Sequence, residues 1–293
     1  MPFRFIKKES LANAIRRLCR RRVAAAQNCL RHSGRADGIH NVRKEIKKLN
    51  AVLKLVRDDL GKGRRRKLRK RLQGMAKEFS IVRDAQVMSS AFMKLTRPQK
   101  LPAIAFLEIK SGLRENLKQM ERKFAESKRV AVIARELRKL KKDFRTLKPK
   151  SDDWTAIGRG LERSFRRGQN ALETIRADPS PRRFHQWRKR VKDLWLQMRL
   201  IREASSKRLR TMTDELKTLG EWLGDDHDLF LLTEFIARNL KRSENADRLI
   251  GLAGKRQKEL RTAALDSGAR IYSEAPKQFC RRIGKRWKNW RGK

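Results

Sequence analysis

Residues 39–60 read IHNVRKEIKKLNAVLKLVRDDL, and their pattern predicts an amphipathic helix. At about 100° per residue, one face collects apolar side chains, namely Val42, Ile46, Leu49, Leu53, Val56 and Leu60. The other face collects His40, Arg43, Lys44, Lys47 and Lys54. At a rise of about 1.5 Å per residue, this basic face would extend roughly 21 Å. We therefore expect one face to lie in a core and the other to suit a linear anion.

The same pattern recurs in residues 184–205, which read FHQWRKRVKDLWLQMRLIREAS. When residue 39 is placed over residue 184, identical basic residues align: His40 with His185, Arg43 with Arg188, Lys44 with Lys189, and Lys47 with Lys192. Lys54 falls over Arg199, which keeps the charge. The opposite face of the second segment is again apolar, with Trp187, Val191, Leu194, Met198 and Ile201. The recurrence predicts an internal duplication, with halves at residues 1–148 and 149–293.

A second match follows downstream. The segment FSIVRDAQVM at 79–88 aligns with LGDDHDLFLL at 223–232, so that Asp84 meets Asp228 and Arg83 meets His227. We expect the two aspartates to pair with an Arg or Lys of a neighbouring helix and to fix its orientation.

Helical periodicity dominates the chain. Apolar residues three and four positions apart recur along most of it, whereas alternating strand patterns are nearly absent. Prolines, glycines and serines interrupt the pattern at intervals, as between helices. The sequence thus predicts an all-α fold with eight or more helices. Trp154, Trp187, Trp195 and Trp222 stand at helical spacing among aliphatic residues, which favours core packing.

The chain carries a large excess of positive charge. Its 293 residues include 78 Lys and Arg against 32 Asp and Glu, a formal net charge of +46. Even with every acid paired, the remaining cations would repel one another, so a polyanionic partner is expected. A hydrophobic content of 39% argues against a disordered chain.

Cysteine usage and hydropathy bear on the compartment. Cys19, Cys29 and Cys280 form no C-x-x-C pair, which fits a reducing intracellular setting. The N-terminal MPFRFIKKES lacks a signal-peptide core, and no stretch approaches the roughly 18 apolar residues of a membrane span. We therefore expect a cytoplasmic protein without membrane contact.

The repeated basic face has two interpretations. A basic amphipathic helix most often exposes a solvated face, but both halves keep His, Arg, Lys and Lys at the same intervals, which favours a binding role. The histidines add a pH dependence. Crowding by cations would lower the pKa of His40 and His185, whereas a bound phosphate would raise it, so that binding should favour the protonated form.

The sequence gives little support for a metal site or a catalytic site. Asp225, Asp226, His227 and Asp228 are adjacent residues, which point about 100° apart on a helix and do not converge on one ion. No nucleophile with its base and no constellation of acid–base carboxylates can be found from the spacing. We expect no metal, no cofactor and no enzymatic activity.

The motif His40-x-x-Arg43-Lys44-x-x-Lys47-Lys48-Leu49 and its counterpart from His185 to Leu194 resemble the CHAD family, the conserved histidine α-helical domain. The resemblance covers nearly the whole chain. It implies two four-helix bundles related by a pseudo-two-fold axis, with a basic channel between the histidine-bearing helices. It also implies non-catalytic binding of inorganic polyphosphate and association with polyphosphate granules. The implied ligand residues are His40, Arg43, Lys44, Lys47, Lys48, Lys54, His185, Arg188, Lys189, Lys192 and Arg199.

The sequence departs from the family pattern in places. Asn50 and Trp195 stand where relatives often carry a further cation, and Asp193 stands where the first half has Lys48. The two halves are therefore expected to engage a polymer unequally. The E-x-E-x-K signature of the triphosphate-tunnel domain, which many relatives carry, is absent from the sequence, so no hydrolase activity is implied.

A sequence-nonspecific nucleic-acid binder is the alternative function. The same cations would attract DNA or RNA, but aromatic residues make up only 6% of the chain and no recognised reading motif is present. Nucleic acid is therefore expected as a weaker competitor of polyphosphate. An enzyme that acts on phosphate chains is a third class, which lacks a metal site or nucleophile in the sequence.

Overall fold

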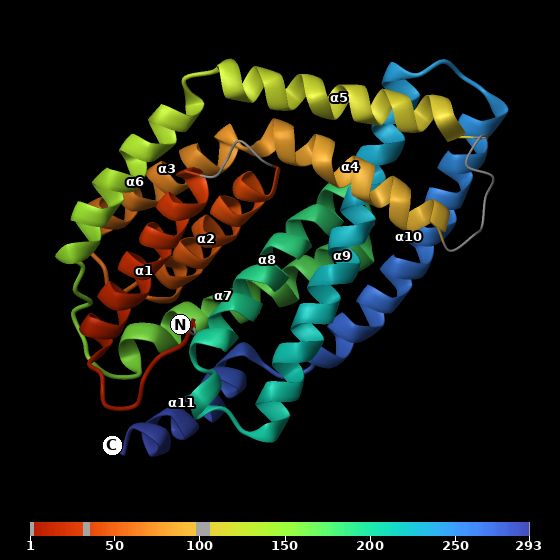
Figure 1. Cartoon of the computed structure of the whole chain (residues 1–293). Coiled ribbons are helices and arrows are strands. Elements are labelled where there is room, and N and C mark those ends of the chain that lie inside the picture. Colours follow the sequence, from red (N-terminus) through yellow and green to blue (C-terminus); the bar gives the residue numbers. More distant parts are fainter. Residues whose placement is uncertain (1–2, 32–35, 98–105, 293) are drawn as a thin grey trace.

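The computed structural model describes residues 3–31, 36–97 and 106–292, and these ranges contain helices and no strands (Figure 1). The predicted all-α class is therefore confirmed for the described residues. The first six α-helices are α1 (Leu11–Arg31), α2 (Ala36–Leu55), α3 (Lys62–Glu78), α4 (Ser80–Thr96), α5 (Leu107–Glu126) and α6 (Arg129–Arg145). The others are α7 (Thr155–Ala177), α8 (Pro181–Leu200), α9 (Lys207–Asn239), α10 (Glu244–Ile271) and α11 (Pro276–Arg291). A short 3₁₀ helix, Arg202–Ala204, follows α8.

Several helix ends follow the signals in the sequence. Pro181 begins α8, where its missing N–H costs no helical hydrogen bond. The Ser206 hydroxyl accepts a hydrogen bond from the backbone N–H of Leu209, and the Ser243 hydroxyl accepts one from Ala246. These caps begin α9 and α10. Local chemistry therefore sets the boundaries of the second half.

The helix bounds agree with the predicted duplication. Helices α2 and α8 are both 20 residues long, and both run over the aligned segments. The next stretch differs, because α3 and α4 are separated at Phe79, whereas α9 continues unbroken for 33 residues. The duplication itself stays a prediction, which the matching helices support.

Two hydrophobic cores hold the helices together. The first core combines α1, α2, α3 and α6 with α7, α8, α11 and the N-terminal part of α9. The second combines α4 and α5 with α10 and the C-terminal part of α9. Figure 1 shows α4 and α5 reaching over to α9 and α10. Both cores cross the predicted boundary at residue 148, which lies between α6 and α7. The division into 1–148 and 149–293, each a four-helix bundle, stays a prediction.

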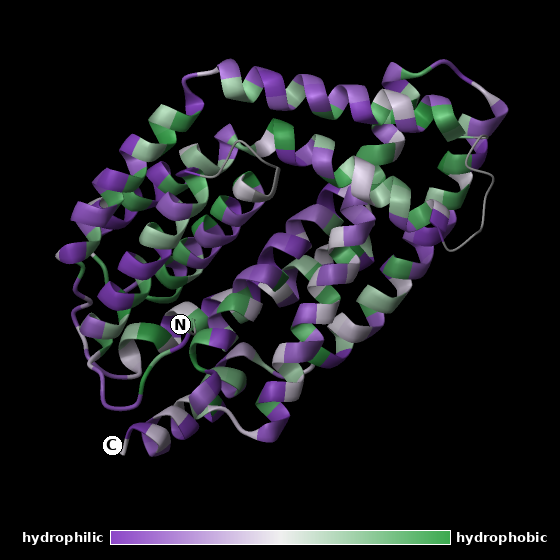
Figure 2. Cartoon of the chain, viewed as in Figure 1, coloured by the Kyte–Doolittle hydropathy of each residue, from purple (hydrophilic) through white to green (hydrophobic). Residues whose placement is uncertain are grey.

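The helices turn their apolar stripes to these cores, as the hydropathy colouring in Figure 2 shows. Trp187 is fully buried, which confirms its predicted core position, while Trp154, Trp195 and Trp222 are partly buried against the cores. A close helix contact depends on Gly160 of α7, since a Cβ at this position would lie 1.8 Å from the carbonyl oxygen of Leu55. Only glycine lets α7 approach the end of α2 so closely.

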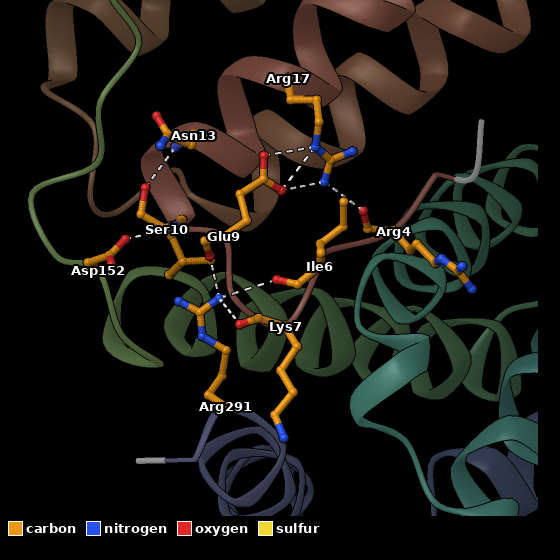
Figure 3. A network of polar contacts seen from close by, with 10 residues as sticks. Arg4, Ile6, Lys7, Glu9, Ser10, Asn13, Arg17, Asp152 and Arg291 are labelled. Carbon is orange, nitrogen blue, oxygen red and sulfur yellow. Dashed lines mark hydrogen bonds and ion pairs between the residues drawn. The ribbon is translucent and has the colours of Figure 1, made fainter.

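The N-terminal segment is bound to the last helix, as Figure 3 shows. The Arg291 guanidinium donates hydrogen bonds to the carbonyl oxygens of Lys7 (3.0 Å) and Glu9. The Glu9 carboxylate accepts hydrogen bonds from Arg17 of α1, at 2.6 to 2.9 Å. The Phe5 ring packs edge-on against Trp287, with ring centroids 5.4 Å apart. The first and last parts of the chain therefore stabilise one common structure.

In the part of the chain that the structure describes, every helix is too short or too polar to cross a membrane.

Candidate anion-binding site

Helices α2 and α8 bury the faces that the periodicity predicts. Val42, Ile46 and Leu49 of α2 are at most 1% exposed, as are Trp187, Val191 and Leu194 of α8. Burial of these faces fixes the rotation of both helices about their axes. The basic side chains on the opposite faces are consequently directed away from the first core.

The two basic faces meet around Arg188. The charge of this residue of α8 acts on Arg43 and Lys47 of α2, and on Arg83 of α4. It also acts on His227 of α9. Four helices thus direct basic side chains into one region. We call this group the basic cluster: His40, Arg43, Lys44, Lys47, Arg83, His185, Arg188, Lys189, Lys192 and His227.

Lys47 shows how crowded the basic cluster is. Enclosure by the protein and, to a smaller extent, the charges of Arg188, Arg43 and Lys192 together lower the pKa of its amine to about 7. Its side chain nevertheless keeps exposed surface, so a ligand can reach it. An anion beside Lys47 would relieve the repulsion and favour the charged amine.

The three histidines of the basic cluster are neutral at neutral pH. Burial, followed by the charges of Arg83 and its own helix, lowers the pKa of His40 to about 4. Burial also lowers the pKa of His185 to about 3 and of His227 to about 4. The rings of His185 and His227 lie against each other at an interplanar angle of 39°, with centroids 3.8 Å apart, and the buried Nδ1 of His185 has no hydrogen-bond partner. A nearby anion would raise the pKa of this histidine pair and favour its protonation.

Two carboxylates oppose the repulsion in the basic cluster. Asp84 of α4 acts on Arg43 of α2, and Asp228 of α9 acts on Arg188 of α8. Burial raises the pKa of both aspartates, while these arginines lower it. The predicted relation between each aspartate and a cation of the neighbouring helix is therefore present as an electrostatic interaction.

Two glycines of α9 make room for basic side chains of α8. A Cβ at Gly220 would lie 3.0 Å from Cε of Lys192, and a Cβ at Gly224 would lie 3.4 Å from Nε of Arg188. The long side chains therefore lie close along the bare backbone of α9. Lys192 also lies over the Trp195 ring, with its amine 5.2 Å from the ring centroid.

Three residues of the predicted ligand set lie outside the basic cluster. Lys48 forms an ion pair with Glu45 at 2.6 Å, and Glu45 also pairs with Arg22. Lys54 pairs with Asp193 of α8 at 2.5 Å. Arg199 stacks over Trp195 at 5.1 Å. Their charges are engaged within the protein by Glu45, Asp193 and the Trp195 ring.

Two members of the basic cluster lie outside the ligand set that the sequence predicts. Arg83 and His227 occupy aligned positions in the two halves, and the alignment was the signal that could have identified them. Arg83 lies on α4, which contacts α2, and His227 lies on α9, which contacts α8. Arg83 acts on His40, and the His227 ring contacts the His185 ring. Each basic face is therefore completed from another helix.

A separate cavity of about 520 Å³ lies between α4, α9 and α10. It shares Asp228 with the surroundings of the basic cluster, and its lining mixes leucines with the ion-paired Lys94 and Asp225. Among the described residues, no group of three or more His, Cys, Asp or Glu side chains is placed to hold a metal ion.

One family model matches this chain, and two solved structures share its fold. The family model named CHAD domain matches residues 14–237. The crystal structure of the CHAD domain from the plant Ricinus communis is similar, with a TM-score of 0.62, 15% identity and coverage of 94% of this chain and 98% of that chain. PptA from Streptomyces chartreusis has a TM-score of 0.61 and 13% identity, and the match covers 91% of this chain and 100% of that chain. A search of curated proteins gave no match.

Proposed function

The chain belongs to the CHAD domain family, and we propose that it binds inorganic polyphosphate, without catalysis, along the basic faces of α2 and α8. One observation carries the proposal. Cations of both helices converge at Arg188, where they act on one another and where Lys47 keeps exposed surface. Such crowding is unfavourable in the free protein, and a polyanion would relieve it.

A linear polymer suits the site better than a single phosphate. From His40 to Lys47 the basic residues of α2 extend about 10 Å at a rise of about 1.5 Å per residue, and α8 repeats this length. Arginine forks can bind phosphate oxygens with two parallel hydrogen bonds, whereas the lysines act as point charges. Successive phosphates would thus meet successive side chains.

The two halves contribute unequally to this proposed path. Lys48 is neutralised by Glu45, and the aligned Asp193 carries the opposite charge. Lys47 of α2 and Lys189 and Lys192 of α8 are all crowded by Arg188. We therefore expect the halves to differ at Lys48 and Asp193, while the crowded lysines of both helices contribute to binding.

We also propose a cytoplasmic setting for this binding, with polyphosphate granules as the structures with which the protein associates. Nucleic acid carries phosphates too and would compete, but several tryptophans that could stack on bases are partly or fully buried in the cores.

The salt dependence of binding tests the proposal. Affinity for long-chain polyphosphate should fall by 10³- to 10⁵-fold between roughly 50 and 200 mM salt if six to ten phosphates are contacted, on the scaling known for nucleic acids. Titration at several salt concentrations measures this slope. Polyphosphate should displace a labelled RNA at a much lower phosphate concentration than RNA displaces polyphosphate. An affinity independent of salt, or the reverse order of competition, would contradict the proposal.

A further inference from the structure

Lys47 differs from other lysines of the two basic faces, because no acidic group compensates its charge. Lys48 and Lys54 form ion pairs with carboxylates. Lys192 has Glu221 among its electrostatic neighbours. The charges that act on Lys47 are all positive. In the described part of the chain, its amine takes part in no ion pair and no side-chain hydrogen bond.

Three helices supply the cations around Lys47. They are Arg43 of α2, Arg188 and Lys192 of α8, and Arg83 of α4. The nearby His40 and His185 are neutral near pH 7 and add no charge. With a pKa of about 7, about half of the Lys47 amines are uncharged at neutral pH. The side chain also keeps exposed surface. Lys47 therefore combines a neutral amine with access from solvent.

A lysine in such surroundings is a nucleophile. Desolvation and neighbouring cations activate lysine amines, because they favour the neutral form that carries a free electron pair. The same cations attract a small anion to the amine. The Nε atom of Arg188 is buried and has no hydrogen-bond partner, and a donor of this kind is costly until a ligand or water satisfies it. A reagent that carries both a phosphate group and an electrophilic carbonyl fits both features.

We propose that Lys47 is a modification site, at which an acyl phosphate transfers its acyl group to the amine. Arg43 and Arg188 bind the phosphate group, and the lone pair of Lys47 Nζ attacks the carbonyl carbon. The C–N bond forms as the C–O bond to phosphate breaks. Inorganic phosphate leaves with the bonding electrons, and the proton released by the amine passes to phosphate or water. Each chain reacts once at this position, so the reaction is not catalysis.

The bound phosphate does not cancel the activation of Lys47. It opposes the repulsion by the neighbouring cations, but enclosure of the amine is the largest cause of the lowered pKa and remains. The resulting amide has no charge, so acylation removes one cation from the basic cluster. The inference needs the basic cluster but not polyphosphate as its ligand. A loss of polyphosphate affinity on acylation would follow as well, and this consequence rests on the proposed function.

Acetyl phosphate tests the site on the natural chain at about pH 7.5, with peptide mass spectrometry following each lysine over time. Lys47 should be acetylated about tenfold faster or more than Lys288, since only about one in a thousand ordinary lysines is neutral at this pH. Lys288 is the internal control, because it is exposed on α11, a helix that packs on α7. The rate at Lys47 should level off above about pH 7, where its amine is largely neutral. Equal rates at the two lysines would overturn the inference.

The variant Arg43→Gln/Arg188→Gln tests the surroundings of Lys47. It removes the donors to phosphate and two of the repelling charges, so acetylation of Lys47 by acetyl phosphate should slow about tenfold. Thermal unfolding verifies the fold of the variant. The control Arg135→Gln/Arg138→Gln removes the same charge from exposed positions of α6 and should change the rate less than about twofold. Equal rates at Lys47 in the two variants would contradict the proposed site.

Acetic anhydride, which has no charge, separates amine reactivity from binding of the phosphate group. Its preference for Lys47 over Lys288 should be smaller than that of acetyl phosphate, because the arginines have no phosphate to bind. An equal preference with both reagents would show that the site does not recognise an acyl phosphate. If Lys47 reacts as expected while long-chain polyphosphate fails to bind, the proposed function fails and the modification site stands.

Discussion

Helices α2 and α8 carry the same basic residues, yet they differ in what the neighbouring helix adds. Near His40 stands Arg83 of α4, a permanent cation. Against His185 stands His227 of α9, which is neutral until it binds a proton. The first half thus offers fixed charge, whereas the second can adjust its charge to pH and to ligand.

The same two regions differ in the backbone beneath the basic side chains. In the second half, Lys192 and Arg188 lie close to Gly220 and Gly224 of the unbroken helix α9. In the first half, the aligned residues are Ala76 and Ser80, and Arg43 donates a hydrogen bond to the Ala76 carbonyl oxygen at 3.3 Å. The interruption at Phe79 lies between them. Aligned cations are therefore positioned by different means.

The pair His185 and His227 is expected to cause the larger of two measurable differences between the halves, a dependence of polyphosphate affinity on pH. In the free protein, the pKa values of His185 and His227 are about 3 and 4, so both are neutral near pH 6. A bound phosphate raises these pKa values, hence binding takes up protons and affinity rises as the pH falls. If the bound phosphate restores the pKa of one of these histidines to its ordinary value of about 6.5, affinity should rise about tenfold from pH 8 to pH 5.5, since each pH unit below that pKa contributes a factor of about ten. Titration with long-chain polyphosphate at constant ionic strength measures it.

Histidine variants show which half of the chain causes the pH dependence of polyphosphate affinity. His185→Gln/His227→Gln should lose most of the pH dependence, while His40→Gln should keep most of it because Arg83 charges the first half at every pH. A flat affinity in the natural chain, or an equal loss in both variants, would show that the halves do not differ in this way.

Substitution of a glycine of α9 is expected to cause the smaller difference, a modest loss of polyphosphate affinity. Gly220→Ala would force Lys192 to move, because the new Cβ would lie 3.0 Å from its Cε. Polyphosphate affinity should fall about threefold, although alanine favours the helix by roughly 1 kcal/mol. Gly254→Ala in α10 is the matched control, since a Cβ there meets nothing within 4 Å and the position is exposed. Thermal unfolding and affinity, measured together, separate stability from binding. Equal affinities in the two variants would remove the positioning role of Gly220.

Much of the site could be predicted from the sequence because α2 and α8 are long and periodic. Their buried faces, such as Ile46 and Val191, fix where His40 and His185 are directed. The alignment of the halves supplied the rest of the pattern. Local periodicity thus determined both basic faces before any tertiary contact was considered.

Tertiary features could not be predicted in the same way. Periodicity shows that α4 has an apolar face, but not that it packs against α9 of the other half, because any apolar face can cover another. The placement of Arg83 in the basic cluster depends on that packing. Lys48 differs, since Glu45 lies three residues earlier and their ion pair follows from helical spacing.

The convergence of α2 and α8 at Arg188 is tested most directly by reversing Arg43 and Arg188, the arginines that these two helices contribute to the basic cluster. Arg43→Glu/Arg188→Glu should weaken long-chain polyphosphate binding by about 100-fold or more, since charge-assisted hydrogen bonds are lost and repulsion is added. Arg20→Glu/Arg21→Glu changes the net charge equally on α1 and should cost less than about fivefold. Arg43→Gln/Arg188→Gln, with its fold verified by thermal unfolding, should fall between them. Equal losses in the two reversal variants would show that net charge, and not the meeting of α2 and α8, binds the polymer.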